Sequence, residues 1–270
     1  MKTWVKILIS CIAAVFAIGS ATAVVIFNDW FEKNHIHKFE NHLCDCGEYD
    51  DTVAIVSDGV IYESITDIVE VAPTDRTEVV ITLYADVTSA AFKVIAGQNI
   101  IIDLNGHKLY IIGPGVGSTG TETLGFQLLK GAKVTFKDGT IAVPEGTTGI
   151  KMLIQNYCDL TLEDVIVDGR NLDTNSQFNY TVSNNCGNVV IKGSTKIYAT
   201  ENRTDNMSFA LDACRFSTYT DGVTVTFVDF DGIISGAIEI SGNAPTKVGE
   251  AKIIAPNGTI LTANGIYYFI

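Results

Sequence analysis

Residues 151–191 read KMLIQNYCDLTLEDVIVDGRNLDTNSQFNYTVSNNCGNVVI and contain one short pattern twice. Apolar segments at 151–154 and 159–162 recur at 179–182 and 188–191, and Asn, Asp and Gly lie between them. Val, Ile, Thr, Phe and Tyr favour strands, whereas Gly, Asn and Asp favour turns. This stretch therefore predicts pairs of short strands that return at a nearly fixed interval.

The first segment of the pattern recurs along most of the chain. Its seven copies are FKVI ending at Ile95, FQLL at Leu129, KMLI at Ile154, NYTV at Val182, FALD around Leu211, IEI at Ile240 and YYF at Phe269. The intervals between copies from Leu129 onward are 25, 28, 29, 29 and 29. The first interval, 34, contains a Gly-rich stretch that we expect to be a loop. A second apolar segment follows each of the first five copies.

No repeat contains an amphipathic segment of helix length, which excludes leucine-rich and ankyrin-type solenoids. Repeats of about 25–30 residues with several strands and polar turns are typical of a parallel β-helix, in which stacked coils share one core. The sequence therefore predicts an all-β fold, a single-stranded right-handed parallel β-helix of about seven coils.

A second regularity lies among the cysteines. Three of them recur at a constant interval of 28, and an Asn or Asp precedes each by two positions: Asn156 and Cys158, Asn184 and Cys186, Asp212 and Cys214. Stacked coils bring equivalent residues to about 4.8 Å. The spacing therefore predicts an inward column of cysteines beside a column of Asn and Asp. Cys is commonly buried as a small apolar residue, so we expect free thiols, with a disulfide between neighbouring coils as the alternative.

Two stretches carry a resemblance to a known family. VVITLYADVTSAAFKVIAGQNIIIDLNGHKL (79–109) and KVTFKDGTI (133–141) resemble repeats of pectate-lyase-like β-helix domains in surface proteins of Firmicutes and their phages. The similarity covers roughly residues 55–240 and specifies the coil better than the function. It implies a short capping helix over the first coil, matched by residues 60–72, where Ile61, Ile65, Ile68 and Val69 share one face.

The two ends of the chain differ in character. Lys2 and Lys6 precede an apolar run over residues 7–27, which predicts a signal peptide or an uncleaved membrane anchor and an extracytoplasmic body. We expect a linker over 28–52 and the β-helix domain over 53–270. Residues 251–270 are expected to form a last coil. We expect a partner to cover its exposed edge, and that partner could be a second copy of the chain.

The linker contains a cluster of potential zinc ligands: His35, His37, His42, Cys44 and Cys46. Imidazole and thiolate at close spacing can hold Zn²⁺ tetrahedrally. The segment HIHKFENHLCDCGE resembles the His-x-His and Cys-x-x-Cys-Gly knuckle found beside repeats in surface proteins of Gram-positive gut bacteria, here with the cysteine pair contracted. The alternative is a flexible spacer without metal, with oxidised thiols in an exported chain.

The sequence offers little support for catalysis. β-Helix enzymes cleave polysaccharides with paired carboxylates, or with a basic residue and Ca²⁺. His107, the sole His outside the linker, lies in an expected turn, and Arg occurs only at 76, 170, 203 and 215. The best candidate pair is Asp212 and Glu239, which fall in corresponding segments of consecutive repeats.

Two further groups of acidic residues are weaker candidates. Asp164, Asp168 and Arg170 could line a groove with Asp138 from the preceding repeat, although stacked turn residues explain them equally well. Asp221, Asp229 and Asp231 could supply oxygen ligands to Ca²⁺.

The net charge of the chain limits the classes of partner that we expect it to bind. A formal charge of −13 argues against nucleic acid, which needs clustered Lys and Arg, and it repels polyanionic glycans. We therefore expect a non-enzymatic extracellular β-helix module that binds a neutral glycan or a surface protein, or serves as a rigid spacer. The alternative is a polysaccharide lyase or glycoside hydrolase.

Overall fold

The computed structural model describes residues 38–201, 207–216, 222–244 and 250–268. The chain divides into two compact units, Met1–Thr52 and Val53–Ile270. In the first unit, β1 (Phe39–Glu40) and β2 (Leu43–Cys44) pair antiparallel. The second unit is all-β with long parallel sheets, and α3 (Ile65–Val71) is the helix within its described residues. None of the described helices is long and apolar enough to cross a membrane, and the predicted signal or anchor over 7–27 lies outside the described residues.

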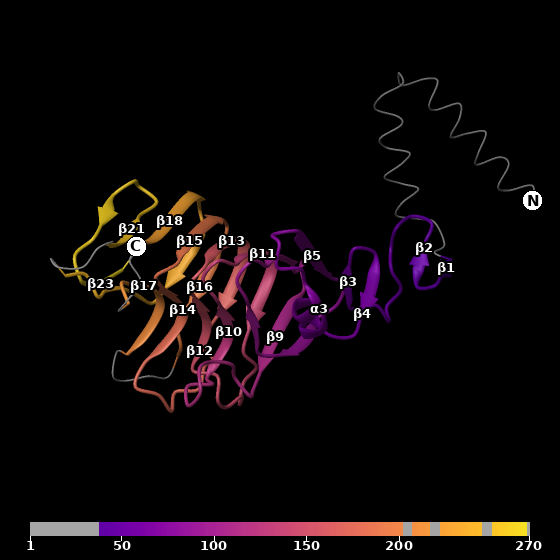
Figure 1. Cartoon of the computed structure of the whole chain (residues 1–270), viewed down its shortest axis with the longest axis horizontal. Helices are drawn as coiled ribbons and strands as arrows, with labels where there is room; N and C mark the ends of the chain where they lie inside the picture. The colour runs from indigo at the N-terminus through magenta and orange to yellow at the C-terminus, as the bar shows by residue number, and fades with distance from the viewer. Residues whose placement is uncertain (1–37, 202–206, 217–221, 245–249, 269–270) are drawn as a thin grey trace, which may run out of the picture. The chain divides into compact units, whose positions relative to one another are not determined.

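The strands of the second unit form two sheets (Figure 1). The seven-stranded sheet holds, in spatial order, β7 (Phe92–Val94), β10 (Leu124–Leu128), β12 (Met152–Asn156), β14 (Asn179–Asn185), β17 (Ser208–Cys214), β20 (Ala237–Ser241) and β23 (Gly265–Tyr267). The main path of the other sheet holds β4 (Val60–Tyr62), β3 (Ile55–Ser57), β5 (Glu78–Leu83), β8 (Asn99–Asp103), β11 (Lys133–Ala142), β13 (Asp159–Asp168), β15 (Asn188–Gly193), β18 (Val223–Phe230), β21 (Ala251–Ile254) and β22 (Ile260–Leu261). Four strands join it off this path: β6 (Val87–Ala90), β9 (Lys108–Ile112), β16 (Lys196–Tyr198) and β19 (Ile233–Ser235).

The chain alternates between the two sheets. β10 pairs in parallel with β7 and β12, and β11, the next strand along the chain, pairs in parallel with β8 and β13. Each strand therefore lies beside strands from the preceding and following repeats, as Figure 1 shows for β11, β13, β15 and β18. Parallel neighbours of this kind require long connections, which the intervening strand in the other sheet supplies.

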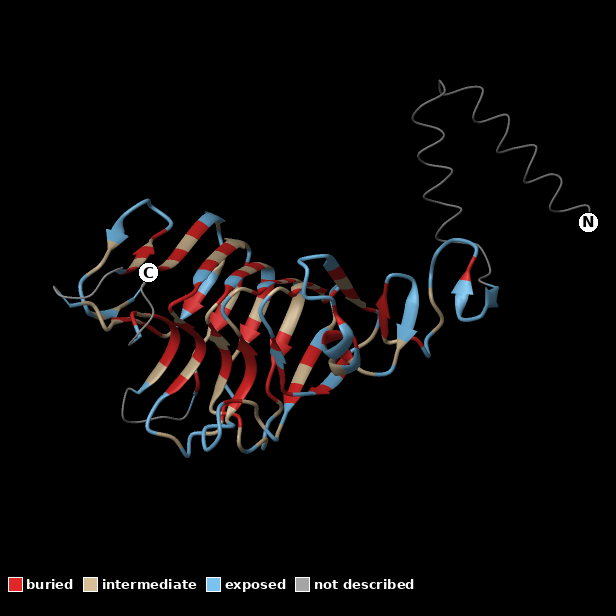
Figure 2. Ribbon diagram, in the orientation of Figure 1, coloured by how far each residue is buried: buried red, intermediate tan, exposed pale blue. Residues whose placement is uncertain are grey.

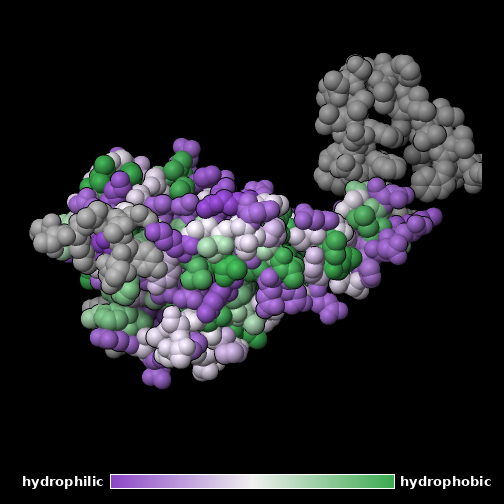
Figure 3. All heavy atoms as spheres, in the orientation of Figure 1, coloured by the Kyte–Doolittle hydropathy of each residue, from purple (hydrophilic) through white to green (hydrophobic). Residues whose placement is uncertain are grey.

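In the larger sheet the core is built from alternate residues of the strands, whereas in the seven-stranded sheet consecutive residues of β10 and β17 are buried. In β13, the buried Leu160 and Leu162 alternate with exposed or half-buried neighbours, and such alternation gives the bands of red with tan or pale blue on the strands in Figure 2. Aromatic packing joins the two sheets, because the Phe126 ring of β10 lies 5.2 Å from the Phe136 ring of β11 between centroids. Within the seven-stranded sheet, the Phe126 ring lies 4.9 Å from Phe92 of β7. The alternation follows from the two-residue period of a strand with one face buried. On the outside of this unit, hydrophilic and hydrophobic residues are interspersed over the visible face (Figure 3).

Polar residues bend the longer strands. Asp138 within β11 and Asp164 within β13 have positive φ values of 57° and 50°, and Asn105 between β8 and β9 has 48°. Asn and Asp tolerate this left-handed conformation better than other non-Gly residues. Beyond these bends the larger sheet continues as a second section, which we call its second face. This second face is formed by β6, β9, the ends of β11 and β13, β16 and β19.

The observed register corrects part of the predicted spacing. Phe126 is paired with Ile154, an interval of 28 where the sequence pattern gave 25, and Leu211 is paired with Ile238, not with Ile240. The predicted interval of 29 between Val182 and Leu211 is confirmed. The predicted intervals are wrong where the ends of the apolar segments were aligned. The register of the strands is set by the apolar side chains that lie in the core, and differences in the length of the repeats fall in the turns.

The predicted cysteine column is correct for two of its three members. Cys158 and Cys186 are buried, and Asn156 is paired with Asn184. Cys214 is half-buried and is paired with Asn185, so it stands one residue out of the column. The apolar register fixes β17, and the cysteine near its end follows that register.

Both ends of the unit differ from the expected repeats. Helix α3 begins after the N-cap Ser64, so Ile61 lies in β4, 39% exposed, whereas Ile65 is buried. At the other end the expected last coil is correct only in its first strand: β21 pairs in parallel with β18, whereas β22 and β23 pair antiparallel with β21 and β20. The chain reverses after β21 in a turn at Gly258, whose φ of 81° suits glycine.

Candidate functional site

The second face of the larger sheet carries a row of residues in register. Tyr110 of β9 is paired with Ala142 of β11, Ala142 with Asp168 of β13, and Asp168 with Tyr198 of β16. Their neighbours Leu109, Ile141, Val167 and Ile197 are fully buried, so the row lies on the outer side of the strands. A parallel row, two positions earlier on each strand, runs through Lys108, Thr140, Ile166 and Lys196.

A hollow of about 570 Å³ lies over these rows. It is lined by Lys108, Tyr110, Thr140, Ala142, Val143, Pro144, Glu145, Ile166, Asp168, Arg170, Asn171 and Tyr198. The small Ala142 between larger side chains leaves room for it, and the segments that follow β11 and β13 wall one side. Asn171 Nδ2 donates to Val143 O at 3.1 Å, which ties these two walls together.

Arg170 is held in a fixed position beside the hollow. Its Nε donates to Asp168 Oδ1 at 2.9 Å and its Nη2 to Asp168 Oδ2 at 2.6 Å, while the guanidinium lies 5.0 Å from the centroid of the Tyr198 ring. Burial alone would raise the pKa of Asp168, but the hydrogen bonds and charge of Arg170 outweigh it and lower that pKa. A bidentate pair stacked on an aromatic ring is rigid and leaves other guanidinium N–H groups to meet a ligand.

The side chains that line the hollow suit a polar, uncharged ligand. Lys108 and Arg170 supply two positive charges, and Glu145 and Asp168 supply two negative ones, so the lining is formally neutral within a chain of −13. Tyrosine rings present apolar faces, and the arginine and asparagine side chains present hydrogen-bonding groups. Such a lining suits a molecule with hydroxyl groups and flat apolar faces.

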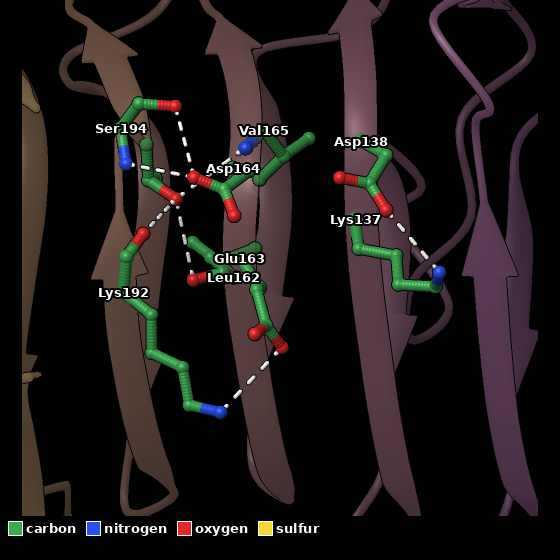
Figure 4. A network of polar contacts seen from close by, with 9 residues as sticks. Lys137, Asp138, Leu162, Glu163, Asp164, Val165, Lys192 and Ser194 are labelled. Carbon is green, nitrogen blue, oxygen red and sulfur yellow. Dashed lines mark hydrogen bonds and ion pairs between the residues drawn. The ribbon is translucent and has the colours of Figure 1, made fainter. Parts of the chain in front are cut away.

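The other members of the predicted acidic group lie at the bends of the strands. Asp164 accepts hydrogen bonds from the Ser194 backbone N–H and hydroxyl, both at 2.9 Å, and these bonds lower the pKa of Asp164 (Figure 4). Asp138 forms an ion pair with Lys137 at 3.2 Å. The structure thus assigns Asp168 and Arg170 to the hollow and places Asp138 and Asp164 at the bends within β11 and β13.

Asp212 and Glu239 lie together on the seven-stranded sheet. They are paired in register on β17 and β20, and Tyr180 Oη donates to Glu239 Oε2 at 2.9 Å. Asp212 is 3% exposed and accepts hydrogen bonds from the Asn184 N–H and the Ser183 hydroxyl. Burial raises the pKa of Asp212 to about 7, and the charge of Glu239 adds to the rise. Burial likewise raises the pKa of Tyr180.

Three of the five candidate metal ligands, His42, Cys44 and Cys46, lie among the described residues. His42 Nδ1 lies 2.9 Å from Asp50 Oδ2, Cys44 is buried and Cys46 is exposed, while His35 and His37 lie outside the described part of the chain. Within that part no three His, Cys, Asp or Glu residues are grouped as metal ligands. A hydrogen bond with Cys44 raises the pKa of Cys46.

The candidate calcium ligands lie at another bend. Asp229 has a positive φ of 46° near the end of β18, and the Asp231 N–H donates to Gly193 O at 3.1 Å. Asp221 lies outside the described residues. His107, at the bend between β8 and β9, has its Nδ1 3.7 Å from Asp86.

Sequence reasoning missed the two tyrosines of the hollow. The signal was present, because KLY at 108–110 and KIY at 196–198 place Lys and Tyr on either side of a buried residue. Comparison of the chain with protein-family models, curated proteins and solved structures finds no match.

Proposed function

We propose that this protein is a carbohydrate-binding module, exported from the cell and built as a right-handed parallel β-helix. The hollow between Tyr110 and Tyr198 is the observation on which the binding function depends. Concave sites with a few fixed polar groups and aromatic walls are the usual places for small-ligand binding. Binding without cleavage agrees with a lining in which one of the two acidic groups, Asp168, is already paired with Arg170.

The β-helix proposal rests on connectivity. From β8 to β20, consecutive described strands of the chain pair with different neighbours. The strands that do pair come from successive repeats, and they pair in parallel. About seven coils and a kinship with pectate-lyase-like surface proteins belong to the same proposal. Export is proposed from the sequence alone, with anchoring through residues 7–27 as one form of it.

The test is a binding assay on the full chain with matched variants. Neutral glycans immobilised as an array, followed by calorimetry on any binder, report affinity directly. Asp168→Asn keeps the side-chain volume but removes the charge that holds Arg170, so it should weaken binding several-fold. Tyr268→Ala changes a tyrosine that is 66% exposed and outside the hollow, so it should bind as the parent does. Equal affinity of Asp168→Asn and the parent would contradict the assignment.

A second function, glycoside hydrolysis, is favoured by one observation. Asp212 and Glu239 are paired on adjacent strands, whose backbones lie about 4.8 Å apart, and this backbone spacing is compatible with the carboxyl separation of about 5–5.5 Å in retaining glycosidases. A carboxyl with a pKa raised to about 7 is suited to a general acid. The burial of Asp212 argues against access by a substrate.

Hydrolysis has its own assay. Release of reducing ends from neutral glycans, measured for the parent, Asp212→Asn and Glu239→Gln, separates it from binding. Activity in the parent that both variants lose would establish hydrolysis at this pair. Inactive parent protein that still binds glycan would leave binding as the function.

A further inference from the structure

We infer that the hollow binds a linear neutral glycan about three sugar units long, lying across the strands along the row from Tyr110 to Tyr198. This inference rests on the proposed function and specifies its ligand. Four observations on the same face carry it: the register of the row, the small residues beside Tyr110, the wall on one side and the balance of charge.

The register sets the length of the site. Tyr110, Ala142, Asp168 and Tyr198 stand on four successive strands, so the two tyrosines are three strand steps apart. Three steps correspond to about 14 Å at the spacing of neighbouring strands. An extended chain of linked pyranose rings repeats at nearly the strand spacing, so roughly one ring falls over each step.

The side chains along the row differ in what they offer a sugar. The register neighbours of Tyr110 are Thr88 and Ala142, both small, so bulky neighbours do not flank its ring within the row. At the other end one face of the Tyr198 ring is occupied by Arg170. Tyr110 is therefore the platform for stacking, and Arg170 backed by Tyr198 is the hydrogen-bond donor at the opposite end.

The wall sets the direction of the ligand. Val143, Pro144 and Glu145 after β11 and Asn171 after β13 bound the hollow beyond the strand ends. A chain running along the strands would meet this wall, whereas a chain running across them follows the row. The glycan therefore runs across the strands, with one tyrosine at each end of its site.

The charges select the class of glycan. The two positive groups of the lining are balanced by Asp168 and Glu145, and Arg170 already forms a bidentate pair with Asp168. A uronic acid polymer would bring further negative charge to a chain of −13, and the arginine of the lining is already neutralised by its partner. A neutral glycan has no such penalty.

The experiment measures affinity against ligand length. The full chain is titrated with oligosaccharides of one to six units from β-1,4-glucan, β-1,3-glucan and β-1,4-linked N-acetylglucosamine, with oligogalacturonates as the anionic arm. For at least one neutral series, affinity should rise steeply up to about three units and then level. Tyr110→Ala should weaken binding of the trisaccharide about tenfold, or about 1.4 kcal/mol, whereas the control Tyr268→Ala should bind as the parent does.

The other outcomes separate the inference from the function. Affinity for a neutral series that does not depend on length, or that Tyr110→Ala leaves unchanged, overturns the inference while carbohydrate binding stands. Tighter binding of oligogalacturonates than of every neutral series overturns the neutral class. If no saccharide in any arm binds, both the inference and the proposed function fail.

Discussion

Replacing Asp212 by Asn is expected to stabilise the protein at neutral pH. The carboxyl group is 3% exposed, and burial is the main reason that its pKa rises from the ordinary 3.8 to about 7. Above that pKa the folded protein must hold a buried carboxylate whose neighbours include Glu239, Tyr180 and Cys214. Asn has nearly the same shape, and its amide oxygen can still accept from the Asn184 N–H.

The magnitude follows from the shift. A pKa of about 7 against 3.8 corresponds to about 4 kcal/mol of free energy that opposes folding once the group is ionised. Between pH 4 and 7 the folded chain retains the proton that the unfolded chain has lost, so the free energy of unfolding falls as the pH rises. The contribution of Asp212 is therefore most favourable below pH 4 and is lost above pH 7.

Urea denaturation of the full chain at pH 4 and pH 8 tests this reasoning. Asp212→Asn should gain up to about 4 kcal/mol over the parent at pH 8 and close to nothing at pH 4. Asp173→Asn is the control of opposite sign, because backbone N–H groups of Gly149 and Asn175 lower the pKa of Asp173. That variant should lose stability at pH 8. A loss of stability for Asp212→Asn at both pH values would refute the reasoning and show that the carboxylate is stabilised in the folded protein.

Three further predictions concern the core and the turns. Phe126→Ala should lower the free energy of unfolding by about 3–5 kcal/mol, measured in urea, because a fully buried ring between Phe92 and Phe136 is lost; a loss under about 1 kcal/mol would contradict the packing. Cys158, which burial gives a raised pKa, should react with a thiol reagent only after unfolding, whereas the exposed Cys46 should react at once in native protein; rapid labelling of Cys158 would be inconsistent with its burial. Gly139→Ala should destabilise the protein in thermal denaturation, since the new Cβ would lie 2.5 Å from the His107 carbonyl oxygen, while Gly222→Ala, with its nearest atom at 3.6 Å, is the tolerated control.

The sequence was a good guide to the parallel strands because their physics is periodic. Recurring apolar segments predicted β12, β14 and β17, and the interval of 29 between Val182 and Leu211 was correct. It was a poor guide at the ends, where no periodic neighbour exists. After β21 the chain turns back at Gly258 and pairs antiparallel with itself, so the expected last coil is not completed.

The candidate site was hidden for a related reason. The row from Tyr110 to Tyr198 is regular in space, yet its successive intervals along the chain are 32, 26 and 30. A search for one fixed period cannot align these positions, because the connections between strands vary in length while the backbone hydrogen bonds keep the strands in register. Asp168 and Arg170 were noticed as charged residues, but the tyrosines are ordinary members of alternating strands. They become a candidate binding site only when three strand steps bring KLY and KIY into the lining of one hollow. In a stack of parallel strands, therefore, the core can be read from sequence periodicity, whereas a binding surface must be read from the register.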